Sequence, residues 1–429
     1  MKLSDDEKAM LDGSRGNARR KAMELLVRYA EALGASGFVE TSNVAGVPGA
    51  ATPFLQQHYR AAGSSSYAAI FSYFDLDSDE LLEVPVAATH TCHLQGGYDP
   101  EQWQLLGGKP EAVQLAQGSE QFVQDRGVQI LKTCTPYQVG NVPRFGEHCA
   151  WMESSAVVYC NSVLGARTNT EGRESTSAAM LTGRVPDWGF HRDECRSGSH
   201  LIEVEFPVES MMDWGMLGYF VGAAVQERIP VLRGRYAVPD LIRHKHFGAA
   251  AASSGGVEMY HLVGVTPEAP SEQQALGARR PVEIIRYGAE ERRQVYRDLN
   301  SRARDADVDF VMLGCPHAAL EQLREAARLL QGRHISANCN LWIFTARAIK
   351  LEAEREGLVQ VLRAAGAVVL TDTCSAIGQA LPPGTRVVAL DSAKQTHYLP
   401  AIMGVQAWFG STGDCIDAAI SGHWRGELR

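Results

Sequence analysis

The sequence predicts a multi-domain α/β protein with a mainly parallel, doubly wound sheet in its C-terminal part. With 429 residues, the chain is too long for one ordinary core. Its composition, 45% hydrophobic and 21% charged, is typical of a globular protein. Beyond residue 281, short apolar runs alternate with helix-length spacers, which is typical of βαβ units in a parallel sheet. The predicted strands are 282–287, 309–313, 341–345, 367–371, 386–390 and 405–409.

The N-terminal part, residues 1–270, is less regular, and we expect an α/β region with a buried polar helix and site-forming loops. Its first helix is clear, because apolar residues up to Leu33 follow the helical period and Gly34 is a typical C-terminal stop. Further predicted elements are helices at 110–130, 151–164 and 212–225 and a strand at 201–206. The segment 266–281 contains three prolines and is the predicted boundary to a C-terminal domain, 282–429.

Charge and cysteine content exclude several classes of partner. The net charge of −9 and the pI of about 5.8 argue against a nucleic-acid or anionic-membrane partner. The most apolar predicted helix, 212–225, is too short to cross a bilayer, and its spaced glycines favour close packing against another helix. Nine cysteines without a recognisable signal peptide indicate reduced thiols and a cytoplasmic protein.

Two cysteines are expected at one edge of the C-terminal sheet. Cys315 and Cys374 each come just after an apolar run that predicts a buried strand. Because ligands bind outside the carboxyl ends of parallel strands, two thiols there suggest a metal or cluster site, with Cys134 as a candidate third thiol. Three alternatives stay open: ordinary packing, a nucleophile at Cys315 paired with His317, and a rival metal site at His90, Cys92 and His93. No CxxC motif is present, which excludes zinc-ribbon and thioredoxin-like motifs.

Polar residues in apolar surroundings indicate further candidate groups. The helix predicted at 151–164 carries Glu153, Ser154, Ser155 and Asn161. Polar groups in a buried helix need partners, which either a binding pocket or ordinary side-chain-to-backbone bonds supply. Lys394 follows a predicted strand end, and Arg167 follows the buried helix. Either cation is suited to a substrate carboxylate, although a solvated loop lysine is an equal alternative for Lys394. Dinucleotide, P-loop, GxSxG and HExxH motifs are absent.

Taken together, several ordered blocks resemble the aconitase X family over essentially the whole chain. The blocks are 10–13, 133–137, 151–156, 161–169, 253–256, 261, 264–268, 314–317, 372–374 and 392–394. The most specific is Asn161–Ser162–Val163–Leu164–Gly165–Ala166–Arg167–Thr168–Asn169. The resemblance implies an aconitase-like fold and an iron- or iron–sulfur-dependent hydro-lyase, with Cys134, Cys315 and Cys374 holding a [2Fe-2S] or [3Fe-4S] cluster or a mononuclear iron.

The resemblance also implies a substrate class and a partner. Family activities are dehydration of cis-3-hydroxy-L-proline, our first expectation, and of mevalonate 5-phosphate, with this chain as the large subunit. A separate small swivelling subunit is expected, because the chain resembles the large portion alone. Candidate catalytic residues are Glu153, Ser154, Ser155 and Lys394, and candidate substrate-binding residues are Asn161, Arg167, Asn169, His261 and His317. Alternatives of another class are a metal-free cysteine hydrolase or transferase using Cys315 and His317, and a non-catalytic iron-binding subunit.

Overall fold

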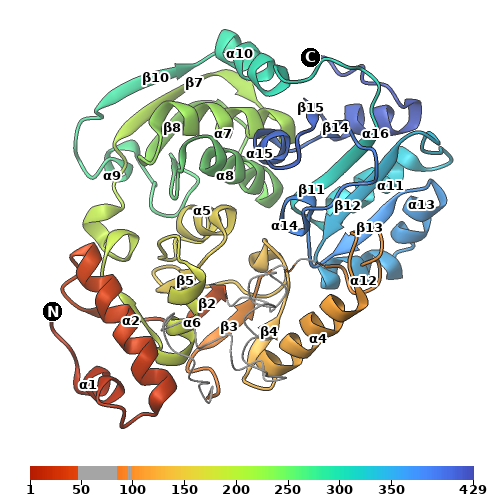
Figure 1. Cartoon of the computed structure of the whole chain (residues 1–429). Coiled ribbons are helices and arrows are strands. Elements are labelled where there is room, and N and C mark those ends of the chain that lie inside the picture. The colour runs from red at the N-terminus through yellow and green to blue at the C-terminus, as the bar shows by residue number, and fades with distance from the viewer. Residues whose placement is uncertain (47–84, 95, 97) are drawn as a thin grey trace.

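Three parallel sheets with their covering helices surround the centre of the molecule. The computed structural model describes residues 1–46, 85–94, 96 and 98–429. Figure 1 shows one sheet at the bottom, built from the first part of the chain, one at the upper left and one at the right. The sheet orders are β4-β3-β2-β5, β10-β7-β8-β9 and β13-β12-β11-β14-β15, and β1 and β6 form a small antiparallel pair. These parallel sheets confirm the predicted α/β class.

The first part of the chain builds the bottom sheet. The bottom sheet contains β2 (Asn43–Gly46), β3 (His90–His93), β4 (Val128–Ile130) and β5 (Cys149–Trp151), and the separate pair consists of β1 (Phe38–Glu40) and β6 (Arg184–Pro186). Its helices are α1 (Asp5–Leu11), α2 (Asn17–Leu33), α4 (Pro110–Gln124), α5 (Ser154–Ser162) and α6 (Arg173–Thr182), with the 3-10 turns η2 (Pro136–Gln138), η3 (Gly189–His191) and η4 (Asp193–Cys195). As predicted, α2 ends at Gly34, whose φ of 70° is left-handed.

The second part forms the sheet at the upper left of Figure 1. It contains β7 (His200–Val208), α7 (Met211–Val225), β8 (Pro230–Tyr236), α8 (Leu241–Gly255), β9 (His261–Leu262), α9 (Glu272–Ala275), β10 (Glu283–Tyr287) and α10 (Ala289–Asn300). The glycines of α7 have the predicted packing role. A Cβ at Gly218 would collide with the backbone of Phe247, and one at Gly222 with that of Ala251. Helices α7 and α8 therefore approach closely only because these positions lack side chains.

The third part is the five-stranded parallel sheet expected from the sequence. It contains β11 (Phe310–Ala318), α11 (Leu320–Leu330), β12 (Asn340–Thr345), α12 (Arg347–Arg355), α13 (Leu358–Ala364), β13 (Val368–Thr371), α14 (Ser375–Gly378), β14 (Val387–Leu390), α15 (Ala393–Met403), β15 (Gln406–Phe409) and α16 (Thr412–Ser421). Successive strand residues face opposite cores: Val311 and Leu313 pack with α11, α13 and α16, whereas Phe310 and Met312 pack on the side of α15. The sheet is therefore covered on both faces.

Four details differ from the sequence-based expectations. The strand predicted at 282–287 exists as β10, but it pairs with β7 and so lies in the second sheet. The helix predicted at 110–130 ends at residue 124, and its last residues form β4. The helix predicted at 151–164 begins only at Ser154, because Trp151 ends strand β5. Cys315 lies inside β11, and the following helix begins at Leu320.

The division of the chain into 1–270 and 282–429 stays a prediction. Within the described residues, no helix is long and apolar enough to cross a membrane.

Candidate active site

The three candidate ligand cysteines lie in one buried region between two sheets. Cys315 lies in β11, Cys374 precedes α14 just after β13, and Cys134 follows β4 of the first sheet. All three side chains are buried. Burial raises the pKa of each thiol, to about 12 for Cys374, and the charge of Cys315 adds to this effect at both other thiols. Cys315 thus interacts electrostatically with both Cys134 and Cys374.

Local backbone geometry interrupts strand β11 around Cys315. Gly314 has a left-handed φ of 86°, and a Cβ there would collide with the carbonyl oxygen of Phe344 on β12. Only glycine permits this close approach at a positive φ. The strand changes its register with β12 between Leu313 and Ala318, and this irregularity contains Cys315.

An ion pair lies beside the thiols. The Nζ atom of Lys394, at the start of α15, donates to Oε1 of Glu153, just before α5, at 2.6 Å. Burial raises the pKa of Glu153, but Lys394 more than offsets this, so the pKa lies below its usual value. Burial lowers the pKa of Lys394, but Glu153 and Cys315 outweigh it and the pKa is raised. Both groups are therefore charged at neutral pH.

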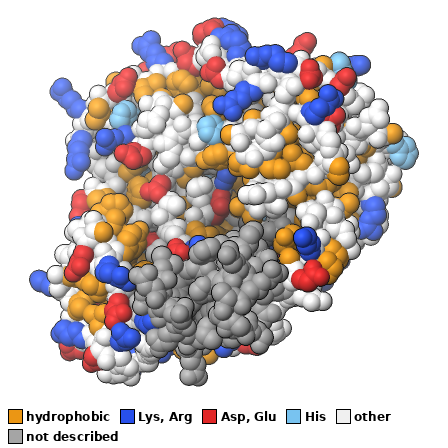
Figure 2. Space-filling model, viewed as in Figure 1, with side chains coloured by type: hydrophobic (Ala, Val, Ile, Leu, Met, Phe, Trp, Pro, Cys, Tyr) orange, Lys and Arg blue, Asp and Glu red, His pale blue; other side chains and the backbone are white. Residues whose placement is uncertain are grey.

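Serines of α5 adjoin this pair. Ser155 donates from Oγ to Oε1 of Glu153 at 3.2 Å, and Ser154 is the partly exposed first residue of the helix. Figure 2 shows acidic and basic side chains in a hollow at the centre of this face, in the region where Figure 1 has α5 and α14. The charges of Glu153 and Lys394 act on Cys134 and Cys315, so this pair and the adjoining serines lie in the same region as the cysteines.

The residues around the cysteines are suited to an iron–sulfur group. The Oγ atom of Ser375 and the Oε1 atom of Gln395 are buried without a partner in the described structure. Gln395 also has its amide nitrogen 4.0 Å from the Cys374 sulfur. Three thiols with orphaned polar atoms beside them match a bound group that these atoms would surround. Among the described residues, no group of three or more His, Cys, Asp or Glu side chains is arranged so that it could hold a metal ion.

His317 connects the cysteine segments through its ring and its backbone. Its Nδ1 lies 2.9 Å from Oγ1 of Thr133, its Nε2 lies 2.8 Å from the carbonyl oxygen of Thr373, and its backbone N–H donates to the sulfur of Cys134 at 3.3 Å. Burial lowers the pKa of His317 to about 4. Both ring nitrogens are occupied, so the geometry does not support His317 as the base for a Cys315 nucleophile.

Two predicted substrate-binding amides are used within the protein. Asn161 donates to the carbonyl oxygens of Thr168 and Glu258 and accepts from the backbone N–H of Thr168. Asn169 donates to the carbonyl oxygen of Trp188 and accepts from the N–H of Phe190. These bonds favour the alternative in which the polar groups of this region form ordinary side-chain-to-backbone bonds and do not line a binding pocket.

Arg167 and His261 are also held by neighbouring groups. Arg167 donates to the carbonyl oxygen of His191 at 2.9 Å and pairs with Asp193. His261 has Nε2 at 2.8 Å from the carbonyl oxygen of Arg196, and its buried Nδ1 has no partner among the described residues. The hydrogen bonds of neither residue lead to the cysteines, so substrate binding by them stays a prediction.

The rival metal site is not supported where it is described. Cys92 is fully buried, and its sulfur accepts from Nδ2 of Asn141 at 3.1 Å. His90 is exposed, and the side chain of His93 lies outside the described residues.

Sequence reasoning missed a buried cation beside the cysteines. Lys245 on α8 is 1% exposed and donates from Nζ to the carbonyl oxygen of His317 at 2.8 Å and to Oε1 of Gln322 at 2.6 Å. Burial lowers its pKa to about 8. Lys245 lies in the polar first half of α8, between His244 and His246 and before the apolar run that begins at Phe247, so the local sequence gives little signal that it is buried.

Comparison with known proteins decides the family. Three family models cover most of the chain: the aconitase X first domain matches residues 1–194, the second domain 198–297 and the third domain 308–421. The chain belongs to the aconitase X family. The fold agrees, because the holo-form of aconitase X from Thermococcus kodakaraensis superposes with a TM-score of 0.80 at 26% identity, covering 98% of this chain and 100% of that one.

Aconitase X relatives of two kinds are similar to this chain over most of its length. The phosphomevalonate dehydratase large subunit of Methanocaldococcus jannaschii is 33% identical over 96% of this chain and 98% of its own length. The cis-3-hydroxy-L-proline dehydratase of Pseudomonas aeruginosa is 34% identical over 98% of this chain and 70% of its own length. Both are dehydratases, which confirms the predicted hydro-lyase class.

The wider relationship bears on the cofactor and on the partner. A 76-residue stretch is 40% identical to the 3-isopropylmalate dehydratase large subunit of Heliobacterium modesticaldum. Membership of the aconitase superfamily suggests an iron–sulfur cluster. The name "large subunit" implies a separate small subunit for the phosphomevalonate enzymes.

Proposed function

We propose that this chain dehydrates a small hydroxy acid at an iron centre held by Cys134, Cys315 and Cys374. The observation that carries the proposal is the meeting of three buried thiols with the Glu153–Lys394 ion pair. Charges of Glu153 and Lys394 act on the thiols of Cys134 and Cys315. The thiols that we propose as ligands and a charged acid–base pair are thus within electrostatic reach of one another.

The roles follow from the charge states. Lys394 keeps its proton, so it is suited to bind the substrate carboxylate and not to act as a base. Glu153 is deprotonated and is the proposed acceptor for the proton on the carbon next to the hydroxyl. Ser155 orients the Glu153 carboxylate through its hydrogen bond, and Ser154 is the alternative proton acceptor. When bound, an iron with an open coordination position supplies Lewis-acid polarisation of the substrate hydroxyl.

Three protein thiols would supply one ligand to each iron of a [3Fe-4S] cluster, and they would leave one position open on a [2Fe-2S] cluster or a mononuclear iron. Because metal binding needs thiolates and burial raises the thiol pKa values, loading releases protons. The positive charges of Lys394 and Lys245 favour the thiolates of Cys134 and Cys315. No disulfide joins any of the nine cysteines, all of which lie within the described residues, and this supports a reducing compartment such as the cytoplasm.

Among substrates we favour cis-3-hydroxy-L-proline. A zwitterionic amino acid has a carboxylate for Lys394 and a cationic nitrogen that the adjacent Glu153 would attract. A phosphomonoester would be repelled by the Glu153 carboxylate. Mevalonate 5-phosphate remains the second candidate, since relatives named phosphomevalonate dehydratase large subunit are 29–35% identical to this chain. For either substrate we propose a separate small subunit as partner, as the names of those relatives imply for them.

The decisive experiment combines metal analysis with substrate assays. The full chain is purified anaerobically, with and without a co-expressed small subunit, and iron and acid-labile sulfide are measured per chain. The expected result is bound iron and loss of water from cis-3-hydroxy-L-proline, with little turnover of trans-4-hydroxy-L-proline or mevalonate 5-phosphate. Turnover that persists after complete iron removal would contradict the proposal. Bound iron without turnover of any candidate in the assembled complex would favour a non-catalytic iron-binding subunit.

A further inference from the structure

The segments leading to Cys134 and Cys374 share a pattern, although they lie in different sheets. Each has a charged residue two positions before the cysteine, Lys132 or Asp372, with left-handed φ values of 45° and 69°. Positive φ is uncommon for residues with side chains, so both backbones turn in the same unusual way just before the thiol. Both charged side chains are buried, and each belongs to an ion pair.

His317 bridges the residues that come next in these segments. Its Nε2 faces the carbonyl oxygen of Thr373, which only accepts, so Nε2 carries the proton. The neutral ring then accepts at Nδ1, and the hydroxyl of Thr133 is the donor. One imidazole therefore holds the residue before Cys134 and the residue before Cys374 at once, and it uses one acceptor and one donor to do so.

The backbone of His317 strengthens the link to the Cys134 segment. Its N–H donates to the sulfur of Cys134, and its carbonyl oxygen accepts from Nε2 of Gln138 at 3.1 Å. Gln138 also donates to the hydroxyl of Thr135 at 2.6 Å. Since His317 lies two residues after Cys315, these bonds tie all three cysteine segments together.

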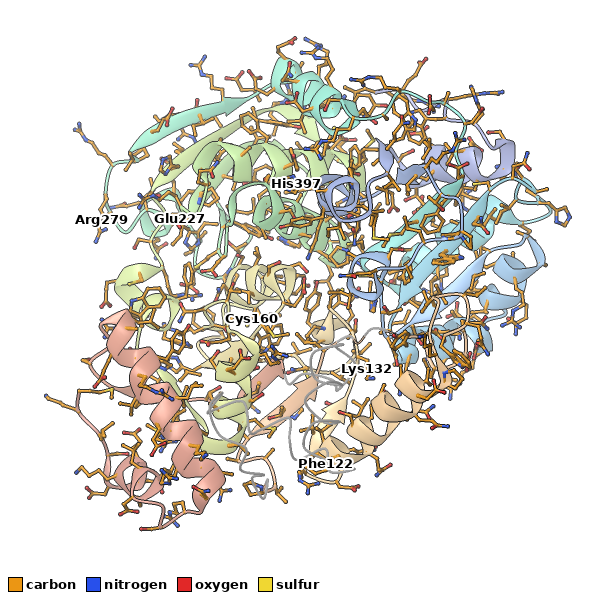
Figure 3. All side chains as sticks on the ribbon, in the orientation of Figure 1. Phe122, Lys132, Cys160, Glu227, Arg279 and His397 are labelled. Atoms are coloured by element: carbon orange, nitrogen blue, oxygen red, sulfur yellow. The ribbon has the colours of Figure 1, made fainter. Side chains whose placement is uncertain are left out.

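An ion network makes a second bridge between the same segments. Arg347 at the start of α12 donates from Nε to both carboxylate oxygens of Asp372, at 2.7 and 2.8 Å. Its Nη2 contacts both carboxylate oxygens of Glu120 on α4 at 3.2 and 3.3 Å, and Glu120 pairs with Lys132. Figure 3 shows Lys132 between α4 and the C-terminal sheet. The two positive and two negative charges of these four side chains balance one another.

We propose that His317 and the network of Lys132, Glu120, Arg347 and Asp372 are positioning groups, which hold Cys134 and Cys374 in register around Cys315. This rests on the proposed function, in which the three thiols hold one iron centre. Cys134 comes from the first sheet and the other two cysteines from the third sheet, so contacts between these parts must fix its distance from them. The two bridges are such contacts, and both end within two residues of a thiol.

The first test replaces His317 in the full chain and measures the alkylation rate of each cysteine by mass spectrometry after iron removal. His317→Leu removes both ring bonds, and we expect Cys134 and Cys374 to react on the order of tenfold faster, with less iron retained on reconstitution. His317→Gln keeps one donor and one acceptor on its side chain, and it is expected to restore most of the slow reaction. Failure of Gln to rescue, with Leu and Gln equal, would overturn the bridging role.

Buried cysteines elsewhere are the internal control. Cys415 is fully buried in the core of the third part, against α11 and β11, away from the three candidate ligands. In His317→Leu its alkylation rate is expected to stay within about twofold of the parent protein. An equal rise at Cys415, Cys134 and Cys374 would mean general loosening of the fold and would overturn the proposal.

The second test breaks the ion network. Arg347→Met leaves Asp372 and Glu120 without their shared cation, and we expect faster alkylation of Cys134 and Cys374 by several-fold, by roughly the weight of a partly buried charge-assisted bond. Arg324→Met is the matched control, because Arg324 also holds a carboxylate, Glu356, through two nitrogens in the same part of the chain. Equal thiol rates in the two variants would show that the network does not position the cysteines.

These thiol rates are measured on iron-free protein, so they separate the two proposals. If the parent protein never binds iron but His317→Leu still exposes Cys134 and Cys374 selectively, the positioning role stands and the iron-dependent function fails. If the parent protein binds iron and dehydrates its substrate while His317→Leu changes neither thiol rates nor iron retention, the positioning role fails alone.

Discussion

Two largely buried ion pairs in this protein differ in how the remaining donors of their cations are used. Arg196 pairs with Glu268 and donates further to the carbonyl oxygens of Phe190, Asn161 and Ala166. Lys394 has one hydrogen bond among the described residues, to Glu153, and otherwise faces the thiols of Cys315 and Cys134. A guanidinium whose bonds all end in the protein fixes the chain, whereas an ammonium with donors to spare is available to a ligand.

The comparison predicts that changes near Lys394 affect chemistry and changes at Arg196 affect folding. Removal of a candidate ligand thiol has the largest expected effect. In Cys315→Ala, turnover is expected to fall below detection and iron per chain to drop, because two thiols cannot replace three. The midpoint of urea unfolding of the iron-free protein should move little. Full activity of Cys315→Ala in the assembled complex would break the proposed ligand set.

Removal of the Lys394 charge is expected to have the next largest effect. Lys394→Met should lower kcat/KM by roughly 10²–10⁴-fold, as is usual for loss of a charged group that binds and orients substrate. Glu153→Gln should lower kcat by a similar factor with a smaller change in KM, since it removes a proton acceptor. Steady-state kinetics on iron-replete complex give both values. A change in KM alone for Glu153→Gln would assign Glu153 to binding.

Arg196→Met should lower stability and leave kcat nearly unchanged, which is the reverse of what we expect for Lys394→Met. The substitution leaves a carboxylate and several carbonyl oxygens without a donor, which we expect to cost about 3–5 kcal/mol of unfolding free energy. The kcat per folded molecule should change by less than about twofold, because Arg196 contacts none of the candidate catalytic groups. Urea unfolding and active-site-normalised kinetics measure the two quantities. Lower kcat with unchanged stability would remove the distinction between the two pairs.

An exposed ion pair is expected to have the smallest effect on the free energy of unfolding. Arg233 contacts Glu203 and Glu272, and its side chain is 43% exposed. Arg233→Met is expected to change the free energy of unfolding by less than about 1 kcal/mol, since water and salt screen such charges. The same urea titration tests it, with Arg196→Met alongside. Equal losses in both variants would show that burial is not what makes the Arg196 pair matter.

Local patterns predicted strands well but not their partners. Every apolar run beyond residue 281 became a strand, because a short apolar run between helix-length spacers has few other uses. The run at 282–287 nevertheless joined β7, since pairing depends on contacts distant in sequence. For the same reason Trp151 ended a strand although its neighbours follow a helical pattern.

The candidate site shows the same division. The position of Cys315 and Cys374 at one sheet edge followed from strand order, which is a general rule of parallel sheets. Cys134 was a candidate third thiol, and only the family resemblance assigned it the ligand role, because nothing local indicates that a loop of another sheet reaches that edge. His317 was interpreted as a substrate or base residue, and only the tertiary structure shows that both its ring nitrogens are occupied.

Because the three thiols come from segments of two different sheets, the order of folding determines when the site can form. During synthesis, Cys134 leaves the ribosome long before Cys374 exists, and the first sheet can fold while the third is still missing. With the proposed ligand set, an iron centre forms only after both sheets have folded and docked. The iron content would then report the fraction of molecules that have completed assembly. Chains with a misplaced C-terminal part would bind no iron and would therefore be colourless.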